Sequence, residues 1–553
     1  MYLFQNKAKN GTVTLYVHKK YRDANGKSTT KVIESLGTLE ELGKIHDDPI
    51  QWAKSYIDEL NKQEKESRRQ VLVSFNPARQ IDKDTQALFE GGYLFLQKIY
   101  SELGLEKICR KISKEYKFEY DLNDILQKLI YGRILFPASK AKTFEESEKL
   151  LEAPNFEQHD IYRALEVLAA NSDFIQSELY KNSCDVVPRN NNILYYDCTN
   201  YFFEIEEEKG IRKYGASKEH RPNPIVQMGL FTDGNGIPLA FCIHPGNTNE
   251  QVTLKPLEKK ILQDFGKAKV VVCTDAGLSS EANRKFNSVQ NRAFITVQSL
   301  KKMSDSKKTW ALTAKGWKLS GSDKRYDLNE LFECEDAETR EKNMEEYHNS
   351  VFYKEEWFID NGLAQRYIVN FSLKYREYER TVRERQIERA NKRIEENRAA
   401  KKNANDPMRF VEQLSFTDTG EVADNTTYIL NKDAIDAESI YDGFYCVATN
   451  LEDPVEDIIR VNERRWEIEE SFRIMKTDFR SRPVYLQRDD RIEAHFLTCF
   501  LSLYIYRILE KKLNEQYTTD QILDTLRNMK FQRIPGEGYV PVYTRTDLTD
   551  ALH

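Results

Sequence analysis

The segment between residues 191 and about 286 most constrains the fold, because strands, turns and helices follow one another in it in a definite order. A helical pattern at 252–265 separates an early group of strands from a later one, KVVVCTD at 269–275. The first group can form a meander, and the helix can return the chain so that the later strand lies parallel to the first. The early strands are NNILYYD, IVQMGLF and IPLAFCI, at 191–197, 225–231 and 237–243.

Two of these strands end at an aspartate. Asp197 closes the first strand and Asp275 closes the strand after the helix. If the two strands are parallel neighbours, both carboxylates lie at the same edge of the sheet. Ligand and catalytic sites of open α/β sheets lie at the carboxyl ends of their strands. The sequence therefore predicts that Asp197 and Asp275 meet at a functional site.

A third carboxylate stands on a helix predicted over VNERRWEIEESFRIMKTDF, Val461 to Phe479. At 100° per residue, four side chains of this helix fall within about 60° of one another and form one stripe: a cation, a carboxylate, an aromatic ring and a second cation. Its members are Arg465, Glu469, Phe472 and Lys476. The stripe is either a solvated salt-bridge face or a surface that holds a carboxylate against something anionic. Trp466, at its margin, can stack on a base or pack into the core, and we favour the core.

Two strand-end aspartates and one helix-borne glutamate can together hold two divalent cations, for which hard oxygen ligands favour Mg²⁺. Such a pair can activate an attacking oxygen and stabilise a leaving oxygen in phosphoryl transfer. The eight histidines form no ligand-spaced cluster, and this chemistry needs none. Arg465 and Lys476 would contact phosphates beside the scissile bond. The residues alone leave a plain charged surface as an open alternative.

Composition limits where nucleic acid can bind. The net charge is −6 although 31% of residues are charged, so any DNA-binding surface must be local. Residues 1–44 carry eight Lys and Arg against four Asp and Glu, on a predicted hairpin over 11–36 with its turn at Asn25-Gly26. That hairpin is either a small DNA-contacting module or a solvated basic surface.

Other segments of the sequence indicate the cellular compartment and a helix of the hydrophobic core. The eight cysteines are scattered without a C-x-x-C pair, and no apolar segment resembles a signal peptide at the start, so we expect a cytoplasmic protein with reduced thiols. The apolar run Phe496 to Tyr506 has 11 residues, too short for a membrane span of ~20, and predicts a buried core helix. The charged helix from Tyr375 to about Lys402 predicts a solvated or coiled face.

At these residues the sequence resembles bacterial insertion-sequence transposases of the DDE type, which have an RNase H-like core. Their signature, Tyr-x2-Arg-x3-Glu-x6-Lys, is matched by Arg465, Glu469 and Lys476, whereas Asn462 stands at the Tyr position. ILYYDCTNYFFE and VVVCTDAG resemble the segments around the first two acidic residues, Asp197 and Asp275. The segment between them, with Ser217-Lys218, Arg221-Pro222 and Gly236-Ile237-Pro238, is also similar.

The resemblance implies a function. Asp197, Asp275 and Glu469 would be ligands of two Mg²⁺ ions, with Mn²⁺ able to substitute. Water would cut a phosphodiester at the terminal inverted repeat of the element, and the released 3′-OH would attack the opposite strand or target DNA. The implied partners are double-stranded DNA and a second copy of the chain on paired ends, with no membrane. The DNA-binding candidates are Arg465, Lys476, Arg473, Lys218 and Arg221.

The expected fold is therefore α/β, with an RNase H-like core interrupted by a mostly β insertion before the last catalytic helix. An N-terminal β-hairpin and a helical DNA-binding region precede this core. The expected boundaries are 1–75 for the hairpin and helix module, 76–190 for the helical region, 191–300 and 441–515 for the two parts of the core, 301–440 for the insertion and 516–553 for a C-terminal tail.

Three other functions fit parts of the pattern. An RNase H-like nuclease would nick DNA without joining strands. A DNA-binding relative without catalysis is disfavoured because all three acidic positions are occupied. A two-carboxylate glycosidase needs its carboxyl groups ~5–9 Å apart and no metal. The cations around Glu469 favour an anionic substrate over a sugar.

Overall fold

The computed structural model describes residues 1–8, 11–22, 28–67, 86–265, 270–396, 406–416, 425–534 and 538–553. The chain forms two separate compact units, Met1–Thr85 and Gln86–His553, and each is described by itself.

The N-terminal unit is a small antiparallel sheet with a helix. The predicted hairpin corresponds to β2 (Val13–Arg22) and β3 (Ser28–Thr38), and β1 (Tyr2–Lys7) adds a third strand beside β2. The Asn25-Gly26 turn lies outside the described residues. Leu15, Leu42 and Ala53 form a small core between the sheet and the two helices, α1 (Leu39–Leu42) and α2 (Pro49–Ser67).

A helical layer opens the large unit, as the 3.6-residue spacing predicts. Its first element, β4 (Leu88–Glu90), is a short strand that the sequence did not indicate. The helices are α3 (Tyr93–Glu102), α4 (Leu105–Ser113), α5 (Leu122–Leu135), α6 (Lys140–Ser147), α7 (Gln158–Ala170) and α8 (Ser172–Ser183).

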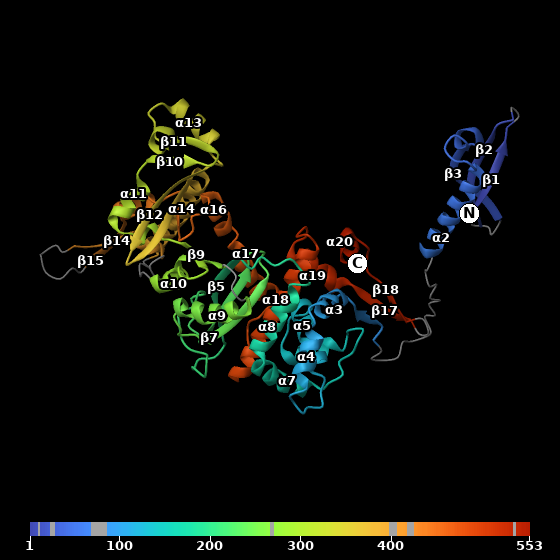
Figure 1. The fold of residues 1–553 in the computed structure, drawn as a ribbon, viewed down its shortest axis with the longest axis horizontal. Helices are drawn as coiled ribbons and strands as arrows, with labels where there is room; N and C mark the ends of the chain where they lie inside the picture. Colours follow the sequence, from blue (N-terminus) through green and yellow to red (C-terminus); the bar gives the residue numbers. More distant parts are fainter. Residues whose placement is uncertain are drawn as a thin grey trace. The chain divides into compact units, whose positions relative to one another are not determined.

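A ten-stranded sheet forms the centre of this unit (Figure 1), with the order β11-β10-β12-β13-β16-β9-β8-β5-β6-β7. The predicted meander and return helix are both present. β5, β6 and β7 pair antiparallel, and β8 and β9 then run parallel to β5. The elements of this part are β5 (Ile193–Phe202), β6 (Ile225–Asp233), β7 (Pro238–Pro245), α9 (Glu250–Phe265), β8 (Val270–Thr274), α10 (Glu281–Phe286) and β9 (Arg292–Val297).

The first strand is longer than its sequence suggested. Asp197 was predicted to end it, yet β5 continues to Phe202. The side chains after Asp197 still suit a strand, because Cys198, Tyr201 and Phe202 are buried. Asp197 therefore lies in the middle of β5, opposite Leu230 of β6, whereas Asp275 directly follows the last residue of β8 as predicted.

The insertion is mixed rather than mostly β, and part of it extends the central sheet. β13 pairs with β16, and β16 with β9, so four insertion strands join the core through backbone hydrogen bonds. The elements are α11 (Asp305–Leu312), β10 (Lys315–Leu319), β11 (Ser322–Asp327), α12 (Leu328–Phe332), α13 (Ala337–Glu346), β12 (Val351–Asp360), β13 (Leu363–Ser372), α14 (Leu373–Glu395), β14 (Val411–Phe416), β15 (Asn425–Leu430) and α15 (Lys432–Ser439). The next strand, β16 (Phe444–Thr449), belongs to the second part of the core.

The single helix predicted from Val461 to Phe479 is interrupted. α16 (Val455–Glu463) and α17 (Trp466–Arg473) are separate, and a π-helical turn, η4 (Ile474–Asp478), follows. Around the break the backbone bonds span three residues, as from the Glu467 N–H to the Arg464 carbonyl (3.1 Å). A tight turn followed by a wide one does not keep the 100° spacing, so the predicted stripe is not one straight face. Trp466, expected in the core, is instead 58% exposed at the first residue of α17, so that expectation was wrong.

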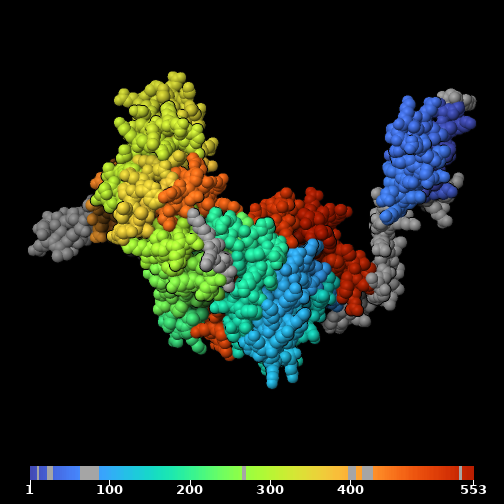
Figure 2. Space-filling model, in the orientation of Figure 1, coloured from blue at the N-terminus to red at the C-terminus, as the bar shows by residue number. Residues whose placement is uncertain are grey.

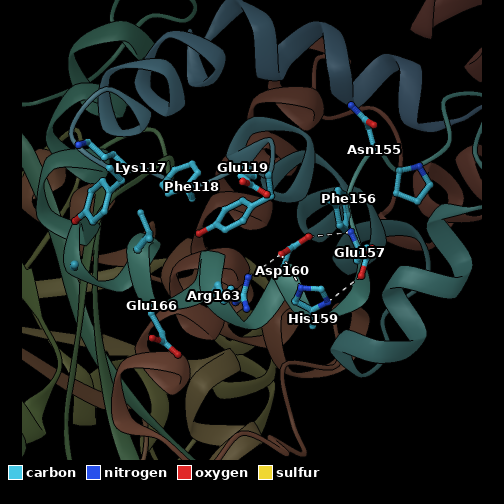
Figure 3. A pocket seen from close by; sticks show the side chains of 15 residues that line it. Lys117, Phe118, Glu119, Asn155, Phe156, Glu157, His159, Asp160, Arg163 and Glu166 are labelled. Atoms are coloured by element: carbon cyan, nitrogen blue, oxygen red, sulfur yellow. Dashed lines mark hydrogen bonds and ion pairs between the residues drawn. The ribbon is translucent and has the colours of Figure 1, made fainter.

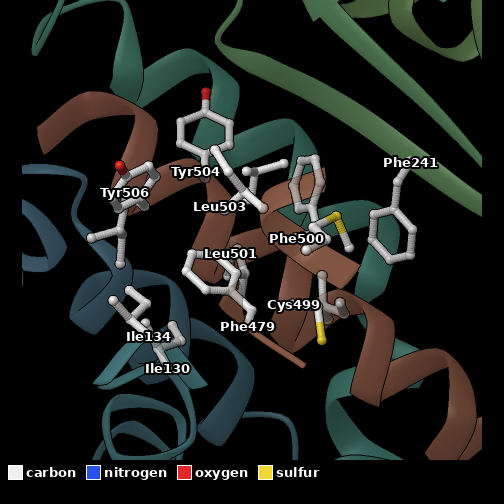
Figure 4. Packing of buried hydrophobic residues seen from close by; sticks show 14 of the residues in the cluster. Ile130, Ile134, Phe241, Phe479, Cys499, Phe500, Leu501, Leu503, Tyr504 and Tyr506 are labelled. Carbon is white, nitrogen blue, oxygen red and sulfur yellow. The ribbon is translucent and has the colours of Figure 1, made fainter. Parts of the chain in front are cut away.

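The predicted core helix is confirmed as α18 (Asp489–Lys512), with every residue from Ala494 to Leu509 buried. It packs against α5, α7 and β7. Phe500 lies beside Phe241 of β7, and Phe479 packs edge-on to Tyr506 (Figure 4). Within the described residues α18 is the one helix long and apolar enough to span a membrane by length and composition, and 94% of its most apolar window is buried in the fold.

The segment expected to be a C-terminal tail is folded. It forms α19 (Thr519–Asn528), β17 (Lys530–Ile534), β18 (Gly538–Pro541) and α20 (Asp547–Leu552). β17 pairs antiparallel with β4, so residues 530–532 lie beside 88–90. In Figure 2 the red C-terminal segment accordingly touches the blue start of this unit.

Candidate active site

Asp197 and Asp275 occupy equivalent places on neighbouring parallel strands. The β5–β8 pairing ends with Tyr196 opposite Thr274, and an aspartate is the next residue of the chain on each side, within β5 and directly after β8. One Asp197 oxygen accepts a hydrogen bond from the Cys198 N–H (2.7 Å), and one Asp275 oxygen accepts one from the Leu278 N–H (3.0 Å). This register brings the two aspartates to adjacent positions at the same edge of the sheet, and their joint role as metal ligands stays a prediction.

The surroundings of Asp197 make its negative charge costly. Burial raises the pKa of Asp197 to about 6, and repulsion from the Asp275 carboxylate contributes in the same direction. The cations Lys218 and Arg465 act against this rise without cancelling it. Two acidic groups that repel each other in a half-buried place are a donor set that a divalent cation would stabilise.

Two lysines lie near Asp197. Lys218 donates to the Cys198 carbonyl and lies 3.3 Å from Glu250. Burial alone would lower the pKa of Lys218, but Asp197 and Glu250 outweigh it, so the pKa is raised. For Lys476, burial and then repulsion from Lys218 lower the pKa to about 8. Lys476 lies in the π-helical turn, 5.3 Å from the Tyr201 ring centre.

Glu469 is not in direct contact with the two aspartates. Its carboxylate is 56% exposed and pairs with the Arg465 guanidinium at 3.1 Å. Arg465 is also close enough to Asp197 to help lower the pKa of that carboxyl. Among the described residues no group of three or more His, Cys, Asp or Glu is preassembled to hold a metal ion. The role of Glu469 as third ligand stays a prediction, and it requires Arg465 to release this carboxylate.

Two of the predicted DNA-binding cations have other partners among the described residues. Arg473 donates to both oxygens of Glu470 (2.7 Å each) and lies 3.1 Å from Asp478. The hydrogen bonds to Glu470 raise the pKa of Arg473. Arg221 lies 3.8 Å from the Glu219 carboxylate, and its guanidinium is 4.1 Å from the Phe202 ring centre.

The structure adds residues that the sequence interpretation missed or left out. Glu219 pairs with Arg482 and lies 3.6 Å from Lys476, so it organises the cations around the site. Its position directly after Lys218 was the available signal. Asn462, at the signature Tyr position, is buried and donates to the Tyr445 hydroxyl (3.1 Å). Tyr445 comes from β16, and no local pattern links it to this helix.

Comparison with known families agrees with this geometry. The family described as "Transposase DDE domain" matches residues 201–505, more than half of the chain. The chain belongs to the DDE transposase family. This transposase also matches "IS1634 family transposase, N-terminal domain" over residues 4–71. Asp275 and Glu469 lie within the DDE match, and Asp197 lies four residues before it starts.

Among solved structures, the transposase is similar to one titled "Cryo-EM structure of piggyBac transposase synaptic complex with hairpin DNA (SNHP)". The identity is 7%, the TM-score 0.37, and 80% of each chain is covered. Another is titled "Mos1 transposase paired-end complex with left transposon end", with 15% identity, a TM-score of 0.13, and 26% of this chain and 45% of that one covered. At these TM-scores neither likeness bears on the assignment. No curated protein matches the sequence.

Proposed function

We propose that this transposase binds double-stranded DNA at the terminal inverted repeats of its insertion sequence, cleaves it and transfers the cut strand. The observation that carries the proposal is the Asp197–Asp275 pair at the end of the β5–β8 register, with Lys218, Lys476 and Arg465 beside it. Carboxylates that hold metals and cations that hold phosphates are the two parts that phosphodiester chemistry needs.

Each residue of the site has a proposed role. Asp197, Asp275 and Glu469 would hold two Mg²⁺ ions, for which Mn²⁺ can substitute. When bound, the ions would activate the attacking oxygen and stabilise the leaving oxygen. Lys218 and Lys476 lie beside Asp197 and would hold the oxygens of the scissile phosphate. An arriving phosphate competes with Glu469 for the Arg465 guanidinium, which frees this carboxylate for the metal.

DNA cleavage by the purified protein tests this proposal. Labelled DNA that carries the natural flanks of the gene is incubated in Mg²⁺ and in EDTA with wild type, Glu469→Gln and Glu470→Gln. Glu470 is the matched control, a neighbouring carboxylate paired with Arg473 outside the site. We expect Mg²⁺-dependent cutting by wild type and Glu470→Gln, and a loss of at least ~100-fold in Glu469→Gln with DNA binding retained.

The products separate strand transfer from simple cleavage. Joined strands support a transposase that completes both steps, whereas nicks alone would indicate a nuclease. Equal cutting by wild type and Glu469→Gln would show that another residue is the third ligand. We propose that the active species is a homodimer on paired ends, and the mass of the protein–DNA complex in light scattering tests this part.

A further inference from the structure

A small pocket between the helical layer and the segment after η4 is lined by cations. Its volume is about 260 Å³. The charged or titratable side chains around it are Arg133, Lys140, Arg480, Arg482 and His495, and no Asp or Glu belongs to its described lining. The other lining residues are Pro137, Ala138, Ser139, Tyr162, Pro483, Val484, Tyr485 and Leu486. We call it the Lys140 pocket.

Two of these cations are buried without a carboxylate partner. Lys140 is 5% exposed and makes no ion pair with a carboxylate among the described residues. Arg133 is 4% exposed and donates to backbone carbonyls of Phe479 and Ala138, while its Nε–H has no partner in the described part of the chain. A buried charge without an opposite charge is costly unless something compensates it.

The charges in this pocket repel one another. Burial, and then the nearby Arg133 guanidinium, lower the pKa of Lys140 to about 7. Burial, Lys140 and Arg133 also hold the pKa of His495 well below its usual range, so its ring is neutral. The Nε2 atom of His495 lies 2.9 Å from the Ser481 carbonyl oxygen. An anion in the pocket would relieve this repulsion and supply the missing acceptor.

A larger cavity elsewhere in the helical layer differs from the Lys140 pocket in the charge of its lining. It has a volume of about 1070 Å³ and is lined by Lys117 and Arg163 but also by four carboxylates. Figure 3 shows these acidic side chains around it: Glu119, Glu157, Asp160 and Glu166. That cavity does not suit an anion, whereas the smaller one does.

The Lys140 pocket adjoins the candidate active site. Arg482 lines it and pairs with Glu219, which in turn lies 3.6 Å from Lys476. We propose that the Lys140 pocket binds one phosphate of the DNA backbone near the phosphate that is cut, with Lys140 as its main buried contact. This inference rests on the proposed function and adds a contact from the helical layer, outside the carboxylate site.

Salt-dependent DNA binding tests the pocket without needing cleavage. The full-length protein is compared with Lys140→Met and with Lys142→Met, an exposed lysine of the same helix paired with Glu145 and Glu146. Binding to flank DNA is measured in EDTA across KCl concentrations. We expect the slope of log K against log salt to fall by about 0.9 for Lys140→Met and to stay unchanged for Lys142→Met.

Inorganic phosphate distinguishes a DNA phosphate from a free one. Phosphate at constant ionic strength should raise the melting temperature of wild type and Lys142→Met more than that of Lys140→Met. It should also slow acetylation of Lys140 in wild type, measured by mass spectrometry, which covers the case in which Lys140→Met does not fold. A phosphate effect with unchanged salt slopes would overturn the DNA contact in favour of free phosphate.

Equal slopes together with no phosphate effect would overturn the pocket entirely and leave Lys140 as a structural residue. The outcome is independent of the cleavage assay. If the protein cuts no DNA but shows the altered slope, the pocket contact stands and the proposed reaction falls. If it cuts DNA with unaltered slopes, the reaction stands and the DNA contact of the pocket falls.

Discussion

At the residue scale, two cations of neighbouring turns have different surroundings. Lys476 faces Asp197 and Lys218, whereas Arg473 is engaged by Glu470 and Asp478. We expect Lys476→Met to reduce cleavage at least ~10-fold and the salt slope of DNA binding by about 0.9. Arg473→Met should leave the cleavage rate and the salt slope within twofold of the wild-type values. It should lower the free energy of unfolding by ~0.5–1 kcal/mol.

Binding isotherms and cleavage rates for the two variants check this pair. If Arg473→Met loses affinity as Lys476→Met does, the sequence-based assignment of Arg473 to DNA is right and its ion pairs open in the complex.

Glu258 of α9 gives a pH-dependent prediction. It is fully buried, and one oxygen accepts from Asn287 (3.1 Å) while the other has no partner in the described residues. Burial raises the pKa of Glu258 from 4.5 to about 7. Folding therefore favours the protonated form, and wild type loses stability as pH rises from about 4.5 through 7.

Relative to wild type, Glu258→Gln should gain up to ~3 kcal/mol in unfolding free energy between pH 4.5 and pH 8, because Gln stays neutral. Urea unfolding at both pH values measures the difference. A difference that does not change with pH would mean that Glu258 titrates normally in the folded protein.

At the element scale, the turn between β6 and β7 packs closely on the helix that carries Glu469. Gly236 in this turn has φ +76°, and a Cβ there would lie 1.7 Å from an oxygen of Glu467 on α17. Gly321, between β10 and β11, has the same φ with open space around it. The backbone is therefore strained for a non-glycine residue at both positions, but only at Gly236 would a Cβ meet another side chain.

We expect Gly321→Ala to cost ~1 kcal/mol and Gly236→Ala ~3 kcal/mol or more, with a loss of cleavage if α17 moves. Thermal unfolding and cleavage rates of the two variants provide the measurements. Equal losses in both would show that φ alone matters and that the turn does not position the helix.

The local patterns of single elements predicted much of this architecture. The apolar runs that became β6 and β8, the spacing in α5 and α9, and the buried run in α18 were all readable, because burial leaves a period in the sequence. Contacts between distant parts of the sequence could not be predicted. Nothing local shows that β13 pairs with β16 or β17 with β4, and the break between α16 and α17 has no Pro or Gly to mark it.

The residues of the candidate site likewise divide into those that a local pattern predicts and those that it does not. Asp275 was readable because its strand stops there, and the adjacency of Asp197 followed from the strand order. The end of β5 was misjudged because a charged residue inside a buried strand resembles a strand end. Glu219 had only its place beside Lys218 as a signal, and the contact of Tyr445 with Asn462 depends on tertiary packing, which a motif does not encode.

At the scale of the whole molecule, the two units have separate cores. Leu15, Leu42 and Ala53 form one core, and the large unit has its own. We expect residues 86–553 expressed alone to melt within ~2 °C of the corresponding transition of the full chain. Calorimetry of both proteins checks this expectation. A drop of 10 °C or more would show that the N-terminal unit stabilises the rest.

The pairing of β17 with β4 has a consequence for how the protein is made. β4 leaves the ribosome early, but its partner is synthesised about 440 residues later, and at ~5–20 residues per second that wait is roughly 20–90 s. The buried helix α18 arrives almost as late. Until then the nascent helical layer lacks its central packing partner. Slower translation should therefore lengthen the time for which this apolar surface stays exposed.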